Sequence, residues 1–320
     1  MAHGPSELPA RYEQLGHYTQ ILVDEAVRRG IVVEVGDAAI GELTMTHGGT
    51  RHTMLESLTD LTSAVAFRRC DHKGLTREVM TRAGLRVPAG REATGDDADV
   101  AFLEEWGDLV VKPARGEQGW GITVGVTTVP DLHDAIDAAR DVHPEVLLEQ
   151  RCPGEDVRVV VIGGEVVAAA VRRPATVVGD GRSSIAELVE RLGEAKTAAG
   201  VEPVAMDDTT LACIATAGHG PDDVLASGER LAVRRTANLH TGGTITDITD
   251  TLAPALADVA RRAADAIDIP VLGLDLMVPD LDGADYVVIE ANEQPGLANH
   301  EPAPTVERFI DLLFPATAEH

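Results

Sequence analysis

The feature that most constrains the fold of this chain is a pair of strand-like segments near its C-terminus, residues 271–278 and 285–292. The dipeptide Asp282-Gly283 lies between them. An Asp-Gly dipeptide between two apolar segments is a strong signal of a β-hairpin. The sequence therefore predicts two antiparallel strands here, with Asp282 and Gly283 as the turn residues.

Three oxygen-bearing side chains should meet on one face of this hairpin. With that turn, Asp275 lies directly opposite Glu290, and Asn292 shares the face of Glu290 because side chains alternate along a strand. Neither segment contains Lys or Arg. Two carboxylates and an amide oxygen are hard ligands that suit Mg²⁺ bridging nucleotide phosphates. The alternative is a solvated polar face on an ordinary hairpin.

Composition narrows the class of protein. The chain has 320 residues, of which 44% are hydrophobic, enough for two or three globular subdomains. It has no apolar run of 18 residues and no signal-peptide pattern, so we expect a cytoplasmic protein without a membrane partner. Its three scattered cysteines predict neither a disulfide framework nor a zinc site. The net charge of −26 argues against a nucleic-acid partner, so local positive charge must hold anionic substrates.

The order of predicted elements indicates an α+β fold and not one doubly wound sheet, because most strands are joined as hairpins. A mixed N-terminal segment covers about the first 65 residues, and 195–228 is a polar excursion with little pattern. The other predicted elements are strands at 109–112, 122–126 and 146–149, a hairpin over 157–171, and helices at 252–267 and 305–314.

A glycine-rich loop follows the apolar strand 109–112. Lys112, one of only three lysines, ends the strand, and Gly116, Gly119 and Gly121 follow. Glycines let backbone N–H groups approach phosphate oxygens closely, and the lysine adds a point charge. A strand follows the loop, which excludes a P-loop and a dinucleotide-binding turn and favours a flap over a nucleotide. The alternative is a plain β-hairpin with an unstructured tip.

Several motifs, in order along the chain, resemble those of the ATP-grasp superfamily. They are Val110-Val111-Lys112-Pro113 with its glycine loop, the segment from Glu149 to Asp156, and Asp275…Glu290-Ala291-Asn292…Pro295-Gly296. Residues 156–164, 171–175, 179–181 and 237–244 resemble the branch that contains cyanophycin synthetases and bifunctional glutathione synthetases. Within that branch, residues 61–66 and 69–73 look most like N-acetylglutaminylglutamine synthetases.

The resemblance implies an ATP-grasp fold, in which two α/β subdomains clamp ATP, preceded by a small N-terminal α/β subdomain. The boundaries expected are 1–66 for the N-terminal subdomain and 67–315 for the ATP-grasp domain. Within the latter, the lid is expected at about 109–172 and the excursion at about 195–228. Because the fused second halves of the larger relatives are missing, we expect the chain to work alone.

The resemblance also implies the reaction. Members of the superfamily use ATP to activate a carboxylate as an acyl phosphate, and an amine then displaces the phosphate to form an amide or peptide bond. The implied partners are ATP, one or two Mg²⁺ ions, a small carboxylate donor and an amine or amino-acid acceptor. A homo-oligomer is compatible with the resemblance.

The resemblance also implies a role for each residue that matches a motif of the superfamily. Asp275, Glu290 and Asn292 would bind Mg²⁺, and Arg158 would contact the γ-phosphate or the substrate carboxylate. Arg172 or Arg173 would stabilise the oxyanion. The implied ATP-binding residues are Lys73, Lys112, Gly116, Gly119, Gly121, Glu149, Gln150, Arg151, Cys152, Asp156 and Asn238. Among these, Glu149 to Cys152 would form the strand that reads adenine, and Asp156 would hold the ribose.

Further residues and other functions remain open at the level of sequence. Asn299 and His300 are expected near the acyl donor. The reaction could be the synthesis of N-acetylglutaminylglutamine, of a glutathione-like product or of another dipeptide. A non-catalytic ATP-binding module and a phosphotransferase on the same fold are the alternatives from other classes.

Overall fold

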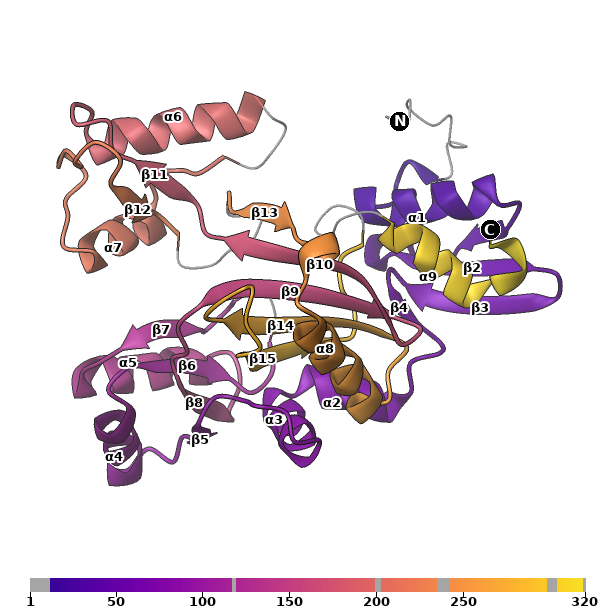
Figure 1. The fold of residues 1–320 in the computed structure, drawn as a ribbon, viewed down its shortest axis with the longest axis horizontal. Coiled ribbons are helices and arrows are strands. Elements are labelled where there is room, and N and C mark those ends of the chain that lie inside the picture. Colours follow the sequence, from indigo (N-terminus) through magenta and orange to yellow (C-terminus); the bar gives the residue numbers. More distant parts are fainter. Residues whose placement is uncertain (1–11, 117–118, 199–202, 235–241, 298–303, 319–320) are drawn as a thin grey trace. The chain divides into compact units, whose positions relative to one another are not determined.

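The computed structural model describes residues 12–116, 119–198, 203–234, 242–297 and 304–318 (Figure 1). The chain divides into two compact units, Met1–Ala170 with Asp247–His320, and Val171–Thr246. The first unit contains two whole sheets and most of a third, whose strands at 165–173 and 244–247 extend across the unit boundaries, and the second unit contains a two-stranded ribbon with two helices. This mixed architecture confirms the predicted α+β class. None of the helices in the described ranges is long and apolar enough to cross a membrane.

The N-terminal part of the first unit is a helix packed on an antiparallel sheet of order β1-β2-β3-β4. Its elements are α1 (His17–Arg28), β1 (Val32–Val35), the 3₁₀ turn η2 (Ala38–Ile40), β2 (Glu42–His47), β3 (Thr50–Leu55) and β4 (Leu58–Thr59). Gly48 and Gly49, with φ of 56° and 87°, close the turn between β2 and β3. The hydrophobic core of this part includes Leu43 and Met45, and it continues into Phe309 and Ile310 of the C-terminal helix.

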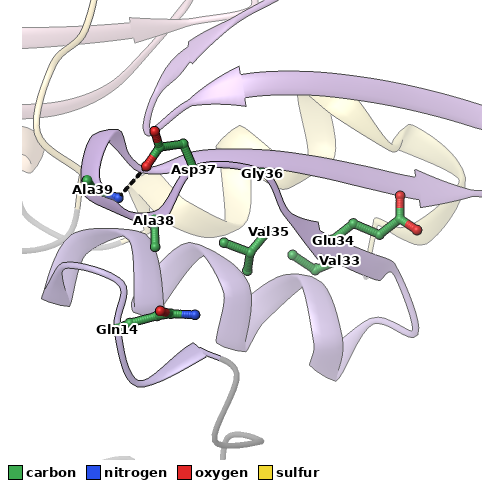
Figure 2. A pocket seen from close by; sticks show the side chains of 8 residues that line it. All are labelled: Gln14, Val33, Glu34, Val35, Gly36, Asp37, Ala38 and Ala39. Carbon is green, nitrogen blue, oxygen red and sulfur yellow. Dashed lines mark hydrogen bonds between the residues drawn. The ribbon is translucent and has the colours of Figure 1, made fainter.

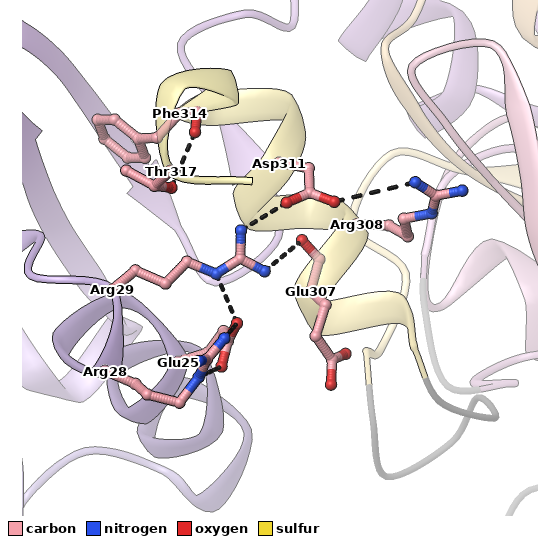
Figure 3. A network of polar contacts seen from close by, with 8 residues as sticks. All are labelled: Glu25, Arg28, Arg29, Glu307, Arg308, Asp311, Phe314 and Thr317. Atoms are coloured by element: carbon pink, nitrogen blue, oxygen red, sulfur yellow. Dashed lines mark hydrogen bonds and ion pairs between the residues drawn. The ribbon is translucent and has the colours of Figure 1, made fainter. Parts of the chain in front are cut away.

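That C-terminal helix, α9 (Thr305–Leu313), is also tied to α1 by a polar network and is followed by the 3₁₀ turn η5 (Pro315–Thr317) (Figure 3). The guanidinium of Arg29 lies 2.6 Å from Glu25 and 2.5 Å from Asp311, and it donates to the carbonyl of Glu307. Only 3% of the Arg29 side chain is exposed. The two ends of the chain therefore share one core and one buried cation.

A second sheet has the order β5-β8-β6-β7. Its strands are β5 (Gly90–Glu92), β6 (Leu109–Pro113), β7 (Thr123–Val126) and β8 (Val146–Gln150), and α4 (Asp97–Trp106) and α5 (Val129–Arg140) pack with it. Val111 and Leu148 point into the core that these helices cover. Because side chains alternate along a strand, Lys112 and Glu149 lie on the opposite face of the sheet.

The third sheet has the order β13-β10-β9-β14-β15. Its strands are β9 (Glu155–Ile162), β10 (Glu165–Arg173), β13 (Thr244–Asp247), β14 (Val271–Val278) and β15 (Val287–Asn292), with the 3₁₀ turn η4 (Thr249–Thr251) after β13. The helix α8 (Pro254–Ile267) packs on β9 and β14, and α2 (Ala64–Asp71) and α3 (Lys73–Arg82) contact β15 (Figure 1). Pro254 starts α8 at a position where its missing N–H costs nothing.

The second unit has its own core. It consists of β11 (Thr176–Val178) paired with β12 (Arg230–Ala232), together with α6 (Ile185–Ala198) and α7 (Asp208–Thr216). Val177, Ile185, Ile214 and Leu231 belong to one apolar cluster. Residues on both sides of the predicted excursion 195–228 thus share a core within Val171–Thr246.

Candidate active site

The predicted hairpin forms, and its register brings the expected residues together. Asp275 on β14 lies opposite Glu290 on β15, and Gly273 lies opposite Asn292. On the other side of β14, Asp275 pairs with Arg158 of β9. These strand pairings place the two carboxylates, the amide and the arginine on neighbouring strands of one sheet.

The predicted two-residue turn is wrong. The connection runs from 279 to 286, and the N–H of Gly283 donates to the carbonyl of Asp280 at 3.0 Å. Pro279 cannot donate a hydrogen bond to the ladder, which ends β14 at Val278. A bulge between Asp275 and Leu276 then shifts the register by one residue and restores the predicted pairing of Asp275 with Glu290.

Asp275 is 7% exposed and is held by a charged partner. Arg158 donates to both of its carboxylate oxygens, with Nη2 at 3.1 Å from Oδ2 and Nε on Oδ1. Asn292 donates Nδ2 to the carbonyl of Gly273 at 3.3 Å and lies 3.5 Å from Oδ2 of Asp275. A Cβ on Gly273 would come within 3.0 Å of Arg158 and 2.9 Å of Pro295, so the glycine allows the arginine to cross the strand.

Lys73 connects this hairpin to the glycine-rich loop. It is the first residue of α3 and is 5% exposed. Its Nζ lies 3.1 Å from Oε1 of Glu290 and donates to the carbonyl of Gly116 at 2.7 Å. One buried ammonium group therefore links the start of the loop to the carboxylate pair.

Lys112 forms a second buried pair. Its Nζ lies 2.6 Å from Oε2 of Glu149, and the two residues are 4% and 2% exposed. The other oxygen, Oε1, is buried without a hydrogen-bond partner among the described residues, and Nη1 of Arg77 stands 3.8 Å from it. Sequence reasoning missed Arg77, although it lies four residues after Lys73 and hence on the same face of α3.

The three loop glycines have φ values that L side chains rarely adopt, 136° at Gly116, 81° at Gly119 and 69° at Gly121. A Cβ on Gly121 would also stand 2.8 Å from the side chain of Val142. Trp120, between two of these glycines, is 70% exposed. The backbone conformation therefore favours glycine at these three positions.

Two backbone N–H groups of the segment expected to read adenine are already engaged within the protein. The N–H of Gln150 donates to Ala89 and that of Arg151 to Asp108, at 2.8 and 3.0 Å. Cys152 contacts the carbonyl of Gln150 through its thiol, and burial together with the charge of Glu149 raises the pKa of that thiol. This pKa suits a packing role and not a nucleophile.

The remaining predicted residues lie on other positions of these strands or outside the described residues. Asp156 is half-buried on β9, opposite Met277. Arg172 and Arg173 end β10 in the second unit and are half-buried. Asn238, Asn299 and His300 lie outside the described residues.

Glu293 is a further carboxyl group close to Glu290. Burial, followed by the charges of Asp71 and Glu290, raises the pKa of Glu293. Burial and the same group of carboxylates also raise the pKa of the Cys70 thiol. Within the described ranges no three His, Cys, Asp or Glu side chains form a metal-binding group. The candidate cation ligands are therefore two carboxylates and one amide, Asp275, Glu290 and Asn292.

A hollow of about 740 Å³ lies away from these residues, beside β1 (Figure 2). It is lined by Gln14 and by residues 33–39, and the carboxylate of Asp37 already accepts the N–H of Ala39 at 2.9 Å. None of the described residues that line it belongs to the Asp275–Glu290 pair or to the glycine-rich loop. The candidate active site is therefore the sheet with the Asp275–Glu290 pair and not this hollow.

Comparisons with known proteins agree with this fold. No family model matches the chain. The chain is 32% identical over 325 residues to a cyanophycin synthetase of Trichormus variabilis. The aligned region covers 95% of this chain and 36% of that relative. A bifunctional glutathione synthetase from Pasteurella multocida superposes with a TM-score of 0.66 at 27% identity, over 94% of this chain and 44% of the other. A D-alanine–D-alanine ligase from Bacillus anthracis superposes with a TM-score of 0.52 at 15% identity, over 80% of this chain and 70% of the ligase.

The chain has the ATP-grasp fold and is homologous to ATP-grasp ligases over nearly its full length. Its relatives in sequence are a cyanophycin synthetase and bifunctional glutathione-biosynthesis proteins. It spans well under half of the length of each.

Proposed function

We propose that this chain is an ATP-dependent carboxylate–amine ligase that makes a small peptide or amide through an acyl phosphate. The observation that carries the proposal is the pairing of Asp275 with Glu290, with Lys73 bridging the pair to the glycine-rich loop. Phosphoryl transfer asks a protein mainly for positioning and for neutralisation of charge. A cluster of hard oxygen ligands beside buried cations supports both tasks.

Asp275, Glu290 and Asn292 fit Mg²⁺ by the chemistry of their donor atoms. The ion would neutralise charge on the phosphates when bound. In the structure, Arg158 is paired with the carboxylate of Asp275, and Lys73 is paired with that of Glu290. When the carboxylates bind the ion, we expect Arg158 and Lys73 to turn toward the γ-phosphate and the neighbouring phosphates. The two cations would then pair with phosphates, and the carboxylates with the ion.

Lys112 and Glu149, on strands β6 and β8 of the second sheet, would contact the nucleotide. Lys112 carries the charge next to the glycine-rich loop, and Oε1 of Glu149 is a buried acceptor that receives no hydrogen bond from the residues that the structure describes. An exocyclic amino group of a base would satisfy this oxygen, whereas a carbonyl group at that position would be repelled. This supports adenine as the base. Gln150, Arg151, Cys152 and Asp156 remain proposed neighbours of the base and ribose, and Asn238 of the phosphate or acceptor side.

Arg172 or Arg173 is proposed to stabilise the oxyanion that forms when the amine attacks. Both stand at the end of β10, where the chain enters the second unit. Arg158, on β9 of the first unit, is proposed to contact the γ-phosphate or the donor carboxylate.

The acyl donor has a candidate pocket next to the hairpin. A hollow of about 250 Å³ is lined by Tyr18, Glu56, Ser57 and residues 294–297. Ser57 donates to the carbonyl of Pro295 at 2.7 Å, and Gln294 donates to Glu56 at 2.9 Å. The N-terminal sheet is thereby fastened to the loop that follows Asn292. A volume of this size suits an amino-acid side chain.

Within this class, N-acetylglutaminylglutamine synthesis is the specific reaction we propose to test first, on the resemblance of residues 61–66 and 69–73. A glutathione-like product or another dipeptide is the alternative. The test is Mg²⁺-dependent release of phosphate from ATP with a panel of acyl donors and amine acceptors, N-acetylglutamine with glutamine included. Release that requires both a donor and an acceptor supports a ligase and identifies its substrates.

Other outcomes of this assay would contradict the proposal. A stable phosphorylated product formed without an amine would identify a phosphotransferase. Binding of ATP by calorimetry without turnover by any pair in a broad panel would favour a non-catalytic nucleotide-binding module. Absence of ATP binding would contradict both.

A further inference from the structure

The junction between α2 and α3 contains a histidine whose two ring nitrogens both have hydrogen-bond partners. His72 is both the C-cap of α2 and the N-cap of α3, and it directly precedes Lys73. Its Nδ1 accepts the N–H of Leu75 at 3.4 Å, and its Nε2 lies 2.7 Å from Oε2 of Glu145. Because Nδ1 acts as an acceptor, the proton of a neutral ring is on Nε2 and is donated to the carboxylate.

Glu145 extends this contact to the start of the glycine-rich loop. Its backbone carbonyl accepts the N–H of Ala114 at 2.8 Å. The carbonyl of Ala114 in turn accepts the N–H of Lys73 at 2.9 Å, and Nζ of Lys73 donates to Gly116 at 2.7 Å. The contacts therefore form a closed ring that runs from His72 through Glu145 and Ala114 back to Lys73, the residue next to His72.

Gly74 allows the ring of His72 to occupy this position. A Cβ on Gly74 would lie 3.1 Å from Cε1 and 3.2 Å from Nδ1 of His72. These distances are tighter than an ordinary van der Waals contact, so a larger residue would press on the imidazole. The His72 side chain is 14% exposed, whereas Glu145 is 51% exposed.

We propose that His72 is a positioning residue, which together with Glu145 holds Lys73 and the start of the glycine-rich loop in the geometry that receives nucleotide phosphates. The inference rests on the proposed function, since it takes Lys73 as a phosphate ligand. His72 acts through Lys73 and does not touch the nucleotide. Loss of the contact should therefore weaken nucleotide binding without slowing the reaction of the bound complex.

The test compares His72→Asn with Glu145→Ala in the full chain. Asparagine keeps a cap acceptor for the N–H of Leu75 but is too short to reach Glu145. We expect each variant to raise the Kd for Mg-ATP and the KM for ATP roughly three- to tenfold, the range of one hydrogen bond, with kcat within about twofold of wild type. The double variant should be no worse than either single variant. Glu145→Gln keeps an acceptor for Nε2–H and should restore most of the affinity.

Glu78→Ala is the matched control, because Glu78 is an exposed carboxylate on α3. Amide hydrogen exchange gives a second readout that does not depend on nucleotide. The N–H groups of Lys73 and Ala114 should exchange faster in His72→Asn, while amides of α8 keep their protection.

The two proposals can fail separately. Unchanged exchange at Lys73 and Ala114, or additive losses of affinity in the double variant, would overturn the role of His72. Wild-type protein that binds no Mg-ATP would overturn the proposed function, and with it the role of Lys73 as a phosphate ligand.

Discussion

The charged residues of the candidate site form three cation–carboxylate pairs: Arg158 with Asp275, Lys73 with Glu290, and Lys112 with Glu149. A buried charge without a partner is costly, so each member of a pair stabilises the other. Removal of one partner therefore changes stability as well as binding. Substitutions that keep shape while removing charge separate the two effects.

Asp275→Asn is the sharpest test of the metal ligands. Asparagine has nearly the same volume and keeps one oxygen for Arg158, so the fold should persist. The loss of a carboxylate ligand should lower kcat/KM at least about 100-fold, a cost of ~2.7 kcal/mol in transition-state stabilisation. Phosphate release against Mg²⁺ concentration measures this effect. Asp258→Asn, in an exposed pair on α8, should leave it unchanged. Full activity of Asp275→Asn would remove Asp275 from the metal site.

Lys112→Met should damage both stability and nucleotide binding. It leaves the carboxylate of Glu149 buried, with Nη1 of Arg77 at 3.8 Å from its Oε1. Breaking a buried pair in this way costs ~3–5 kcal/mol, which chemical denaturation would measure. Adding Glu149→Gln removes the orphaned charge and should recover most of the stability, but not the affinity for ATP. Recovery of both would show that Lys112 has only a structural role.

At the scale of elements, the hairpin shows what the sequence could and could not predict. The pairing of Asp275 with Glu290 was predicted from a two-residue turn at Asp282-Gly283, so the prediction of the pairing was right although its turn was wrong. The eight-residue connection and the bulge were missed; the register next to the connection differs by one residue from that of a two-residue turn, and the bulge removes this difference at Asp275. A two-residue turn with no bulge gives the same pairing.

Residues from separate elements were harder to predict. Arg77 and Glu293 reach the site only through the packing of α3 on β15 and through burial beside Asp71, which are tertiary contacts. The helix α8 was predicted within two residues at its start, because its buried positions recur with helical spacing. The core of Val171–Thr246 joins short strands distant in sequence, and no local pattern indicates that pairing.

The glycine-rich loop gives a prediction at this scale. Gly121→Ala combines a φ of 69° with a Cβ 2.8 Å from Val142, so the loop must shift away from α5. Strain of this kind costs ~1–3 kcal/mol, and we expect the KM for ATP to rise roughly tenfold or more. Gly107→Ala is the control, because Gly107 has a similar φ of 72° with nothing within 4 Å of its Cβ. Adding Val142→Ala to Gly121→Ala should relieve the contact. An unchanged KM in Gly121→Ala would show that this loop geometry is not needed for ATP.

The whole molecule consists of two units with separate cores, and each should respond to its own mutations. In the second unit, Arg234 is 8% exposed and donates to Asp207 at 2.8 Å through both terminal nitrogens. It also donates to the hydroxyl of Thr210. Asp207 caps α7 by accepting the N–H of Thr210 at 2.9 Å. This arginine therefore joins the end of β12 to the start of α7.

Arg234→Met should loosen the second unit and leave the first unit intact. The loss of several hydrogen bonds at a buried site costs ~1–3 kcal/mol, with the part due to Asp207 reduced by solvent because its side chain is 48% exposed. Hydrogen exchange in α6 and α7 should accelerate, while α1 and α8 stay protected. Arg191→Met, which breaks an exposed pair with Asp180 in the same unit, is the control. Equal acceleration in α8 would show that the two units unfold together.

The pH dependence of this effect has a definite sign. Burial opposes ionisation of Asp207, but the N–H of Thr210 and then Arg234 prevail and hold its pKa below the usual value. A carboxyl whose pKa is lowered by folding stabilises the folded state above its unfolded pKa of ~4, and this stabilisation is lost as pH falls toward the folded pKa. Protection of α6 and α7 in wild type should therefore decrease between about pH 5 and pH 3. In Arg234→Met this decrease should be smaller, since only the cap bond remains. An equal decrease in both proteins would assign the acid sensitivity to other carboxylates of the second unit, such as Asp180, whose pKa is also lowered.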